Sequence, residues 1–188
     1  MLNRRDALRG LALTVGGTAT GWAAKAAAAA PVLSWTPVAL TSGQARLVDV
    51  VAELIIPATD TPGARQAGVP QFVDRALADY LDKAQSARLR AGLERMDADA
   101  RAAKGDIFVA LTPQQQVELL TGYEREASTM RSPAPDEEHF FLMLQDLVTV
   151  GYFTSEPGAT LALRYDPIPG AYDGCVPLAQ LGRGWATR

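Results

Sequence analysis

Apolar side chains recur along most of the chain at spacings of three and four residues, the period of amphipathic α-helices. The first run follows the capping residues Thr41 and Ser42 and stops at Pro57. We expect further helices over residues 70–81, about 85–104, from 113 through 123, and 136–153. No segment alternates apolar and polar residues with a period of two. The pattern predicts an all-α fold, a single compact bundle of about five helices.

Helix ends and inward faces can also be read from the sequence. Pro70 suits a first helical position, Gly105 a C-cap, and Thr112 with Pro113 a helix start. The acids 136–138 put negative charge at the start of the last helix, where the helix dipole favours it. The expected core comprises Leu47, Val50, Val51, Leu54, Ile55, Phe72, Val73, Ala76, Leu77, Tyr80, Leu81, Leu89, Leu93, Met96, Ala100, Val117, Leu120, Tyr123, Phe140, Phe141, Leu144, Leu147, Val148 and Tyr152.

Residues 154–188 form a C-terminal arm of different character. Its first part, TSEPGATLALRYDPIPGAYDGCVP, contains four prolines and three glycines, which exclude a long regular element. Two Tyr-Asp pairs flank a Pro-Gly turn, and tyrosine and tryptophan are enriched at interface hot spots. The arm either contacts a partner or packs on its own bundle. Its interface candidates are Tyr165, Asp166, Pro167, Tyr172, Asp173, Cys175 and Trp185.

The N-terminal segment MLNRRDALRGLALTVGGTATGWAAKAAAAA has the pattern of an export signal. The pair Arg4–Arg5, followed by Leu8 and a glycine-diluted apolar stretch, is typical of a twin-arginine (Tat) signal. Roughly 12 apolar residues are too few for a membrane anchor, which needs about 20. We expect residues 1–29 to be removed and residues 30–188 to reach the periplasm already folded.

Charge and cysteine content narrow the possible partners. The net charge is −3, and removal of the basic leader makes the chain more acidic still. Such a surface repels nucleic acid. Cys175 is the single cysteine, so no disulfide can form within the chain. After export it either pairs with a cysteine of another chain or packs as a buried thiol.

The sequence contains few groups that could perform catalysis. It has no G-x-G-x-x-G or C-x-x-C-H motif, and a single histidine with a single cysteine cannot form the usual zinc site. His139 could in principle act as a general base for Ser155 or Cys175, but its position favours a surface or capping role. We therefore expect no catalytic residue, cofactor or metal site in this chain. Three acids interleaved with arginines are interpreted as a solvated helix face: Glu94, Asp97 and Asp99.

Two stretches resemble a known family. GYFTSEPGATLALRYDPIPGAYDGCVPL, residues 151–178, is similar to the C-terminal signature of the gluconate 2-dehydrogenase subunit 3 family. ELIIPATDTPGARQAGVPQFVD, residues 53–74, resembles its N-terminal signature. With the Tat leader, the resemblance extends over nearly all of the mature domain. It implies a small exported subunit that accompanies a large FAD-containing subunit of the glucose-methanol-choline type and often a c-type cytochrome, which carries haem.

The resemblance implies an accessory role. The chain would bind, stabilise and co-export the flavoprotein through the Tat translocase, while electrons pass from FAD to a cytochrome or quinone without touching it. The alternatives are a free-standing periplasmic enzyme with an unrecognised site and an independent ligand-binding protein. The sugar or polyol oxidised and any membrane attachment through a partner are left open.

Overall fold

The computed structural model describes residues 33–130, 138–166, 168, 170, 175 and 177–186. The helical elements are α2 (Ser42–Ile55), α3 (Val69–Arg75), η1 (Ala76–Tyr80), α4 (Lys83–Lys104), η2 (Phe108–Ala110), α5 (Pro113–Thr129), α6 (Phe140–Phe153), η3 (Gly158–Ala162) and α7 (Leu178–Leu181). Among the residues described there is no strand, only an isolated bridge between Arg164 and Trp185. The all-α prediction is confirmed. The predicted signal peptide, residues 1–29, lies outside the described residues.

Local hydrogen bonds account for the positions of the helix ends. Thr41, Asp82 and Thr112 each form a capping box. The cap side chain accepts the backbone N–H of a glutamine three residues on, and that glutamine's side-chain oxygen accepts the backbone N–H of the cap. Asp82 moves the start of α4 slightly upstream of the expected position. Gly105 ends α4 with a left-handed φ of 80°, as predicted.

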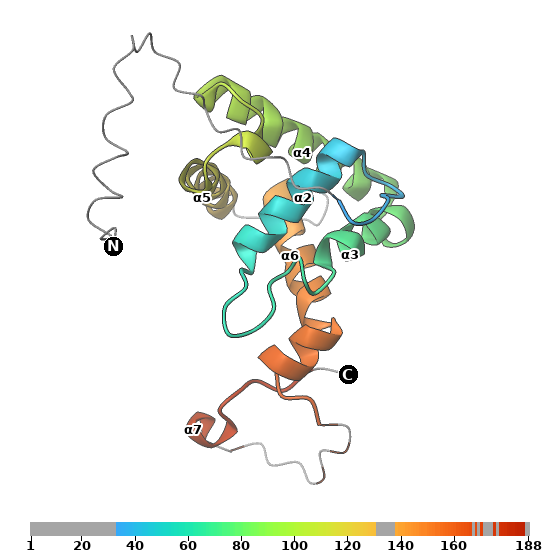
Figure 1. The fold of residues 1–188 in the computed structure, drawn as a ribbon, viewed down its shortest axis with the longest axis vertical. Helices are drawn as coiled ribbons and strands as arrows, with labels where there is room; N and C mark the ends of the chain where they lie inside the picture. Colours follow the sequence, from blue (N-terminus) through green and yellow to red (C-terminus); the bar gives the residue numbers. More distant parts are fainter. Residues whose placement is uncertain are drawn as a thin grey trace, which may run out of the picture.

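Helix α6 runs through the centre of the bundle and contacts α2, α3, α4, α5 and η3 (Figure 1). Its inward face supplies the middle of the core, as the periodicity predicts. Two glycines allow close helix packing: a Cβ on Gly92 of α4 would lie 2.7 Å from Phe140 Cβ, and one on Gly151 would lie 2.6 Å from Phe72 Cδ1. These approaches hold α4 and α3 against α6.

Three predictions about core residues and helix starts are wrong. Tyr80 is 82% exposed because η1 is a π-helix, whose wider turn rotates its last residues away from the apolar face of α3. Val117 is half exposed because Gln116 occupies the buried position and donates to the Phe108 carbonyl at 3.0 Å. The last helix begins only at Phe140, since residues 138 and 139 are not helical.

A buried carboxylate ties the segment before α2 to the bundle. Asp74, 1% exposed, accepts the backbone N–H groups of Val38 at 2.7 Å, Ala39 at 3.0 Å and Leu40 at 2.7 Å. Arg90 of α4 donates to the Ala39 carbonyl. Residues 33–40 are non-helical, and their attachment to the bundle through Asp74 was not predicted.

Candidate partner-binding surface

The arm closes on itself at a short parallel bridge. Arg164 N donates to the Gly184 carbonyl at 2.8 Å, and Ala186 N donates to the Arg164 carbonyl at 2.9 Å. The Arg164 guanidinium lies 4.4 Å from the centre of the Trp185 ring, a cation–π contact. The two ends of the segment from Arg164 to Trp185 are therefore joined.

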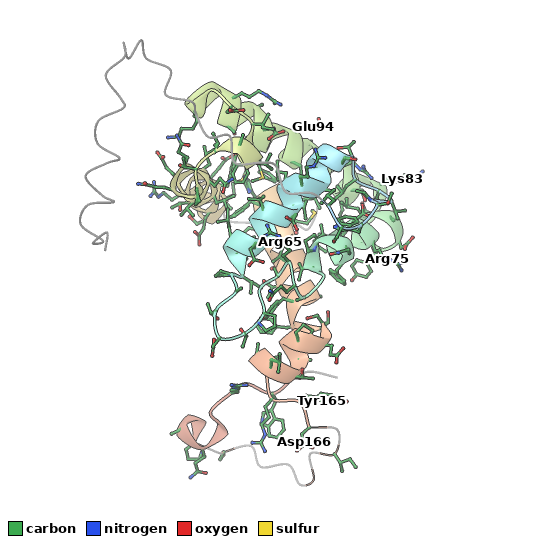
Figure 2. All side chains as sticks on the ribbon, viewed as in Figure 1. Arg65, Arg75, Lys83, Glu94, Tyr165 and Asp166 are labelled. Carbon is green, nitrogen blue, oxygen red and sulfur yellow. The ribbon has the colours of Figure 1, made fainter. Side chains whose placement is uncertain are left out.

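The arm projects from the end of the bundle where α6 terminates. Figure 2 shows Tyr165 and Asp166 beyond this end, whereas Glu94 of α4 lies at the opposite end of the molecule. Tyr165 is 54% exposed and Trp185 is 41% exposed. Neither side chain belongs to the buried core, so contact with a partner remains a prediction for both.

The other sequence-derived candidates are only partly described. Cys175 is exposed, which does not fit the buried-thiol alternative, and its disulfide to another chain remains a prediction. Six candidates lie outside the described residues: Arg4, Arg5, Leu8, Pro167, Tyr172 and Asp173.

An exposed loop that sequence reasoning did not identify as a candidate lies between α2 and α3, over residues 57–68. The Glu53 carboxylate accepts Ala58 N at 3.2 Å and Arg65 N at 2.9 Å, which fixes the backbone on both sides of the loop. The Arg65 Nε donates to both Asp49 carboxylate oxygens, at 3.0 and 2.9 Å. The loop is thus held by side chains of α2, although its outer residues 57–60 are exposed.

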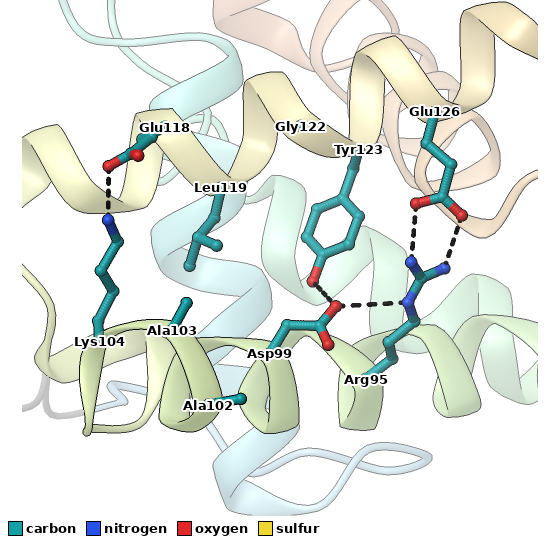
Figure 3. Close-up of a pocket in the computed structure, with 10 residues that line it drawn as sticks. All are labelled: Arg95, Asp99, Ala102, Ala103, Lys104, Glu118, Leu119, Gly122, Tyr123 and Glu126. Carbon is teal, nitrogen blue, oxygen red and sulfur yellow. Dashed lines mark hydrogen bonds and ion pairs between the residues drawn. The ribbon is translucent and has the colours of Figure 1, made fainter.

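A polar cluster lies in an open recess of about 590 Å³ between α4 and α5 (Figure 3). The Arg95 guanidinium donates two hydrogen bonds to Glu126, at 2.9 and 2.7 Å, and its Nε lies 3.4 Å from Asp99. The Tyr123 hydroxyl donates to Asp99 at 2.7 Å. Each of these four side chains therefore has a partner on the facing helix.

The charges in this cluster are fixed by their neighbours. The hydrogen bonds from Arg95 lower the pKa of the Glu126 carboxyl below its ordinary value, and the same bonds raise the pKa of the guanidinium. Burial first, and the bond to Asp99 second, raise the pKa of the Tyr123 hydroxyl. A tyrosine that stays protonated and a carboxylate that stays ionised suit a contact between helices, because neither exchanges a proton near neutral pH.

The only histidine caps a helix. His139 is the N-cap of α6, and its Nδ1 accepts Phe141 N at 3.2 Å while its Nε2 faces Glu126 Oε1 at 3.5 Å. The predicted capping role is confirmed, but the side chain is buried, so the surface alternative is wrong. Ser155 follows the far end of this 14-residue helix, about 21 Å away, so the two cannot form a catalytic pair.

The three acids of α4 have different environments. Glu94 is exposed, as predicted. Asp97 instead accepts Phe108 N at 3.0 Å and Asp99 accepts the Tyr123 hydroxyl, so both hold neighbouring elements.

Among the described residues no three His, Cys, Asp or Glu side chains gather as metal ligands would. Within the same residues, none of the helices combines the length and apolar character that crossing a bilayer requires.

Comparison with known proteins identifies the family. A model of the family described as gluconate 2-dehydrogenase subunit 3 matches residues 42–170, from the start of α2 into the arm. The match includes the loop at 57–68 together with Tyr165 and Asp166, and it ends before Cys175 and Trp185. Searches of curated proteins and of solved structures gave no significant match. The chain therefore belongs to the gluconate 2-dehydrogenase subunit 3 family.

Proposed function

We propose that this chain is the non-catalytic small subunit of a periplasmic flavin-dependent dehydrogenase. It binds and stabilises a large FAD-containing subunit of the glucose-methanol-choline type and carries it through the Tat pathway. The observation that carries this proposal is the family match, because the family is named as a subunit of a dehydrogenase. FAD resides in the large partner, and c-type haem in a cytochrome subunit where one is present.

The described polar groups support an accessory role. The cluster of Arg95, Asp99, Tyr123 and Glu126 joins α4 to α5, and His139 caps α6. These side chains bind one another or the backbone, so their hydrogen-bonding capacity serves the fold. The exposed aromatic residues of the arm, Tyr165 among them, offer the kind of surface that protein interfaces bury.

Purification from the native host tests the accessory role. A tagged chain should recover a flavoprotein that mass spectrometry identifies as a glucose-methanol-choline dehydrogenase, with the visible spectrum of bound FAD. The separated chain should be colourless and inactive toward sugars with artificial electron acceptors. Flavin absorbance or turnover in the separated chain would favour the free-standing enzyme instead.

Export is tested with conservative changes in the leader. Replacing Arg4 and Arg5 together by lysine keeps the charge but removes the pair that the Tat receptor reads. The chain and its flavoprotein should then stay in the cytoplasm, whereas the matched control Arg9→Lys should be exported. Normal periplasmic levels of flavoprotein in the double variant, or in cells without this chain, would contradict the co-export role.

A further inference from the structure

Two segments far apart in the sequence meet at the end of the molecule that carries the arm. The Tyr152 hydroxyl, near the end of α6, donates to the Pro62 carbonyl at 2.8 Å and lies 3.4 Å from Thr61 Oγ1. Both partners belong to the loop at 57–68. Figure 1 shows this loop beside the end of α6 from which the arm departs. The loop and the arm therefore share one end of the bundle.

Tyr152 also determines where the arm begins. Its carbonyl accepts the Ser155 hydroxyl at 2.6 Å, and the Ser155 oxygen in turn accepts Gly158 N at 3.1 Å. A Cβ on Gly158 would lie 2.7 Å from the Tyr152 carbonyl carbon, so η3 approaches the end of α6 this closely only because residue 158 has no side chain. The hydroxyl of Tyr152 thus holds the loop, while its carbonyl holds the root of the arm.

The two exposed aromatic side chains of the arm cannot form a stable interface by themselves. Burying an aromatic side chain removes about 150–250 Å² from water, so the exposed parts of Tyr165 and Trp185 supply roughly 200 Å² together. A stable interface buries about 800 Å² on each partner. A partner that covers Tyr165 and Trp185 must therefore also cover neighbouring surface, which includes the rest of the arm and the loop at 57–68 at the same end.

The loop is already ordered before any partner binds. Glu53 fixes its backbone at Ala58 and Arg65, and a Cβ on Gly63 would lie 2.6 Å from Ala58 N, so the turn is tightly closed. Its exposed tip presents Asp60, whose carboxylate accepts the Thr59 hydroxyl at 2.9 Å. A loop ordered in advance loses less conformational freedom on binding, which favours affinity.

We infer that the loop at 57–68 and the described part of the arm around Tyr165 and Trp185 form one composite docking surface for the flavoprotein subunit, with Tyr152 as the residue that positions both. This inference rests on the proposed function. The occupant is the flavoprotein because the family match, which covers both the loop and the start of the arm, is to a dehydrogenase subunit. The chemistry of the surface calls for an apolar pocket opposite Tyr165 and a hydrogen-bond donor or positive charge opposite Asp60.

A matched pair of tyrosine variants separates positioning from stability. Tyr152→Phe removes the hydroxyl bond to Pro62, and Tyr123→Phe removes a bond of similar length at the α4–α5 end. We expect a similar loss of thermal stability in both. Only Tyr152→Phe should weaken binding of purified flavoprotein to the immobilised full chain, by about fivefold or more, with reductant present to break any disulfide at Cys175.

A second pair tests the loop surface itself. Asp60→Ala changes an exposed tip residue and should weaken binding about threefold or more, whereas Glu124→Ala, exposed on α5, should leave it unchanged. Unchanged affinity in both Tyr152→Phe and Asp60→Ala, with wild-type binding intact, would overturn the composite surface and leave the proposed function standing. Failure of the wild-type chain to bind the flavoprotein would overturn both.

Discussion

Replacing Asp74 by alanine should be among the most destabilising single changes in the chain. This carboxylate is almost fully buried and accepts three consecutive backbone N–H groups, those of Val38, Ala39 and Leu40. Alanine leaves all three donors without their acceptor. The segment before α2 should then lose its attachment to the bundle.

The size of the effect follows from the environment of each donor. The bond to Leu40 N is buried, so losing its acceptor costs the full desolvation penalty, about 2 kcal/mol. The bonds to Val38 N and Ala39 N are partly buried, and water can replace the acceptor at a cost of about 1 kcal/mol each. The sum of about 4 kcal/mol is a large part of the 5–15 kcal/mol typical of a whole domain. It should lower Tm by about 10 °C.

Urea unfolding followed by circular dichroism measures this loss. The matched control is Asp82→Ala, which removes an exposed N-cap acceptor of one N–H at 2.8 Å and should cost about 1 kcal/mol. Asp74→Asn should fall between the two, because one oxygen can still accept Ala39 N and Leu40 N while its amide faces Val38 N. If Asp74→Ala costs no more than Asp82→Ala, the three hydrogen bonds do not stabilise the fold as argued.

Three further changes address packing, pH and the interface. Gly92→Ala should cost about 1–2 kcal/mol in urea unfolding because its Cβ would collide with Phe140, whereas Gly122→Ala, with open space around it, should stabilise α5 by about 0.5 kcal/mol. Equal effects of the two would contradict the packing argument. Glu126→Gln should cost less than about 1 kcal/mol at pH 7, since the pair is partly solvated. Because the pKa of the Glu126 carboxyl is lowered by folding, the ion pair stabilises the fold fully above the ordinary carboxyl pKa of about 4.3, and this stabilisation is lost as the pH falls through the lowered pKa. Wild type and Glu126→Gln should therefore have equal stability in acid. A difference in unfolding free energy that persists at acid pH would contradict this explanation. Non-reducing electrophoresis of the exported complex should show a band at the summed mass of the two subunits, and this band should be absent in Cys175→Ser. If the subunits migrate separately without reductant, Cys175 does not form an intersubunit disulfide.

The helices could be predicted because their signals are local. Periodicity gave the apolar faces, and Thr41, Thr112 and Gly105 marked helix ends through bonds made within one turn. Tyr80 was misplaced because a π-helical turn changes the register of side chains without a marker in the pattern. A surface position for His139 was one of the two predicted roles because acidic residues precede it in the sequence. The structure instead places Glu126 of α5 against the imidazole, which is buried.

The docking surface could be predicted only in part. Composition singled out the arm, but the contact of Tyr152 with Pro62 spans 90 residues, and no local pattern reports it. A signal was nevertheless present in the stretch 53–74. It begins with Glu53, which holds the loop, and ends with Asp74, which holds the segment before α2. Asp74 shares the apolar face of α3, where an unpaired acid would be unfavourable, and that position indicates a buried role.

The bridge between Arg164 and Trp185 is close to thermodynamic balance. Closing a segment of about 20 residues costs roughly 2.5 kcal/mol of chain entropy. Two backbone hydrogen bonds contribute about 1 kcal/mol each, and an exposed cation–π contact about 0.5–1 kcal/mol. Because these contributions nearly cancel, a change at Arg164 shifts the fraction of molecules in which the arm is closed. Arg164 therefore helps to determine how the arm presents Tyr165 and Trp185 to a partner.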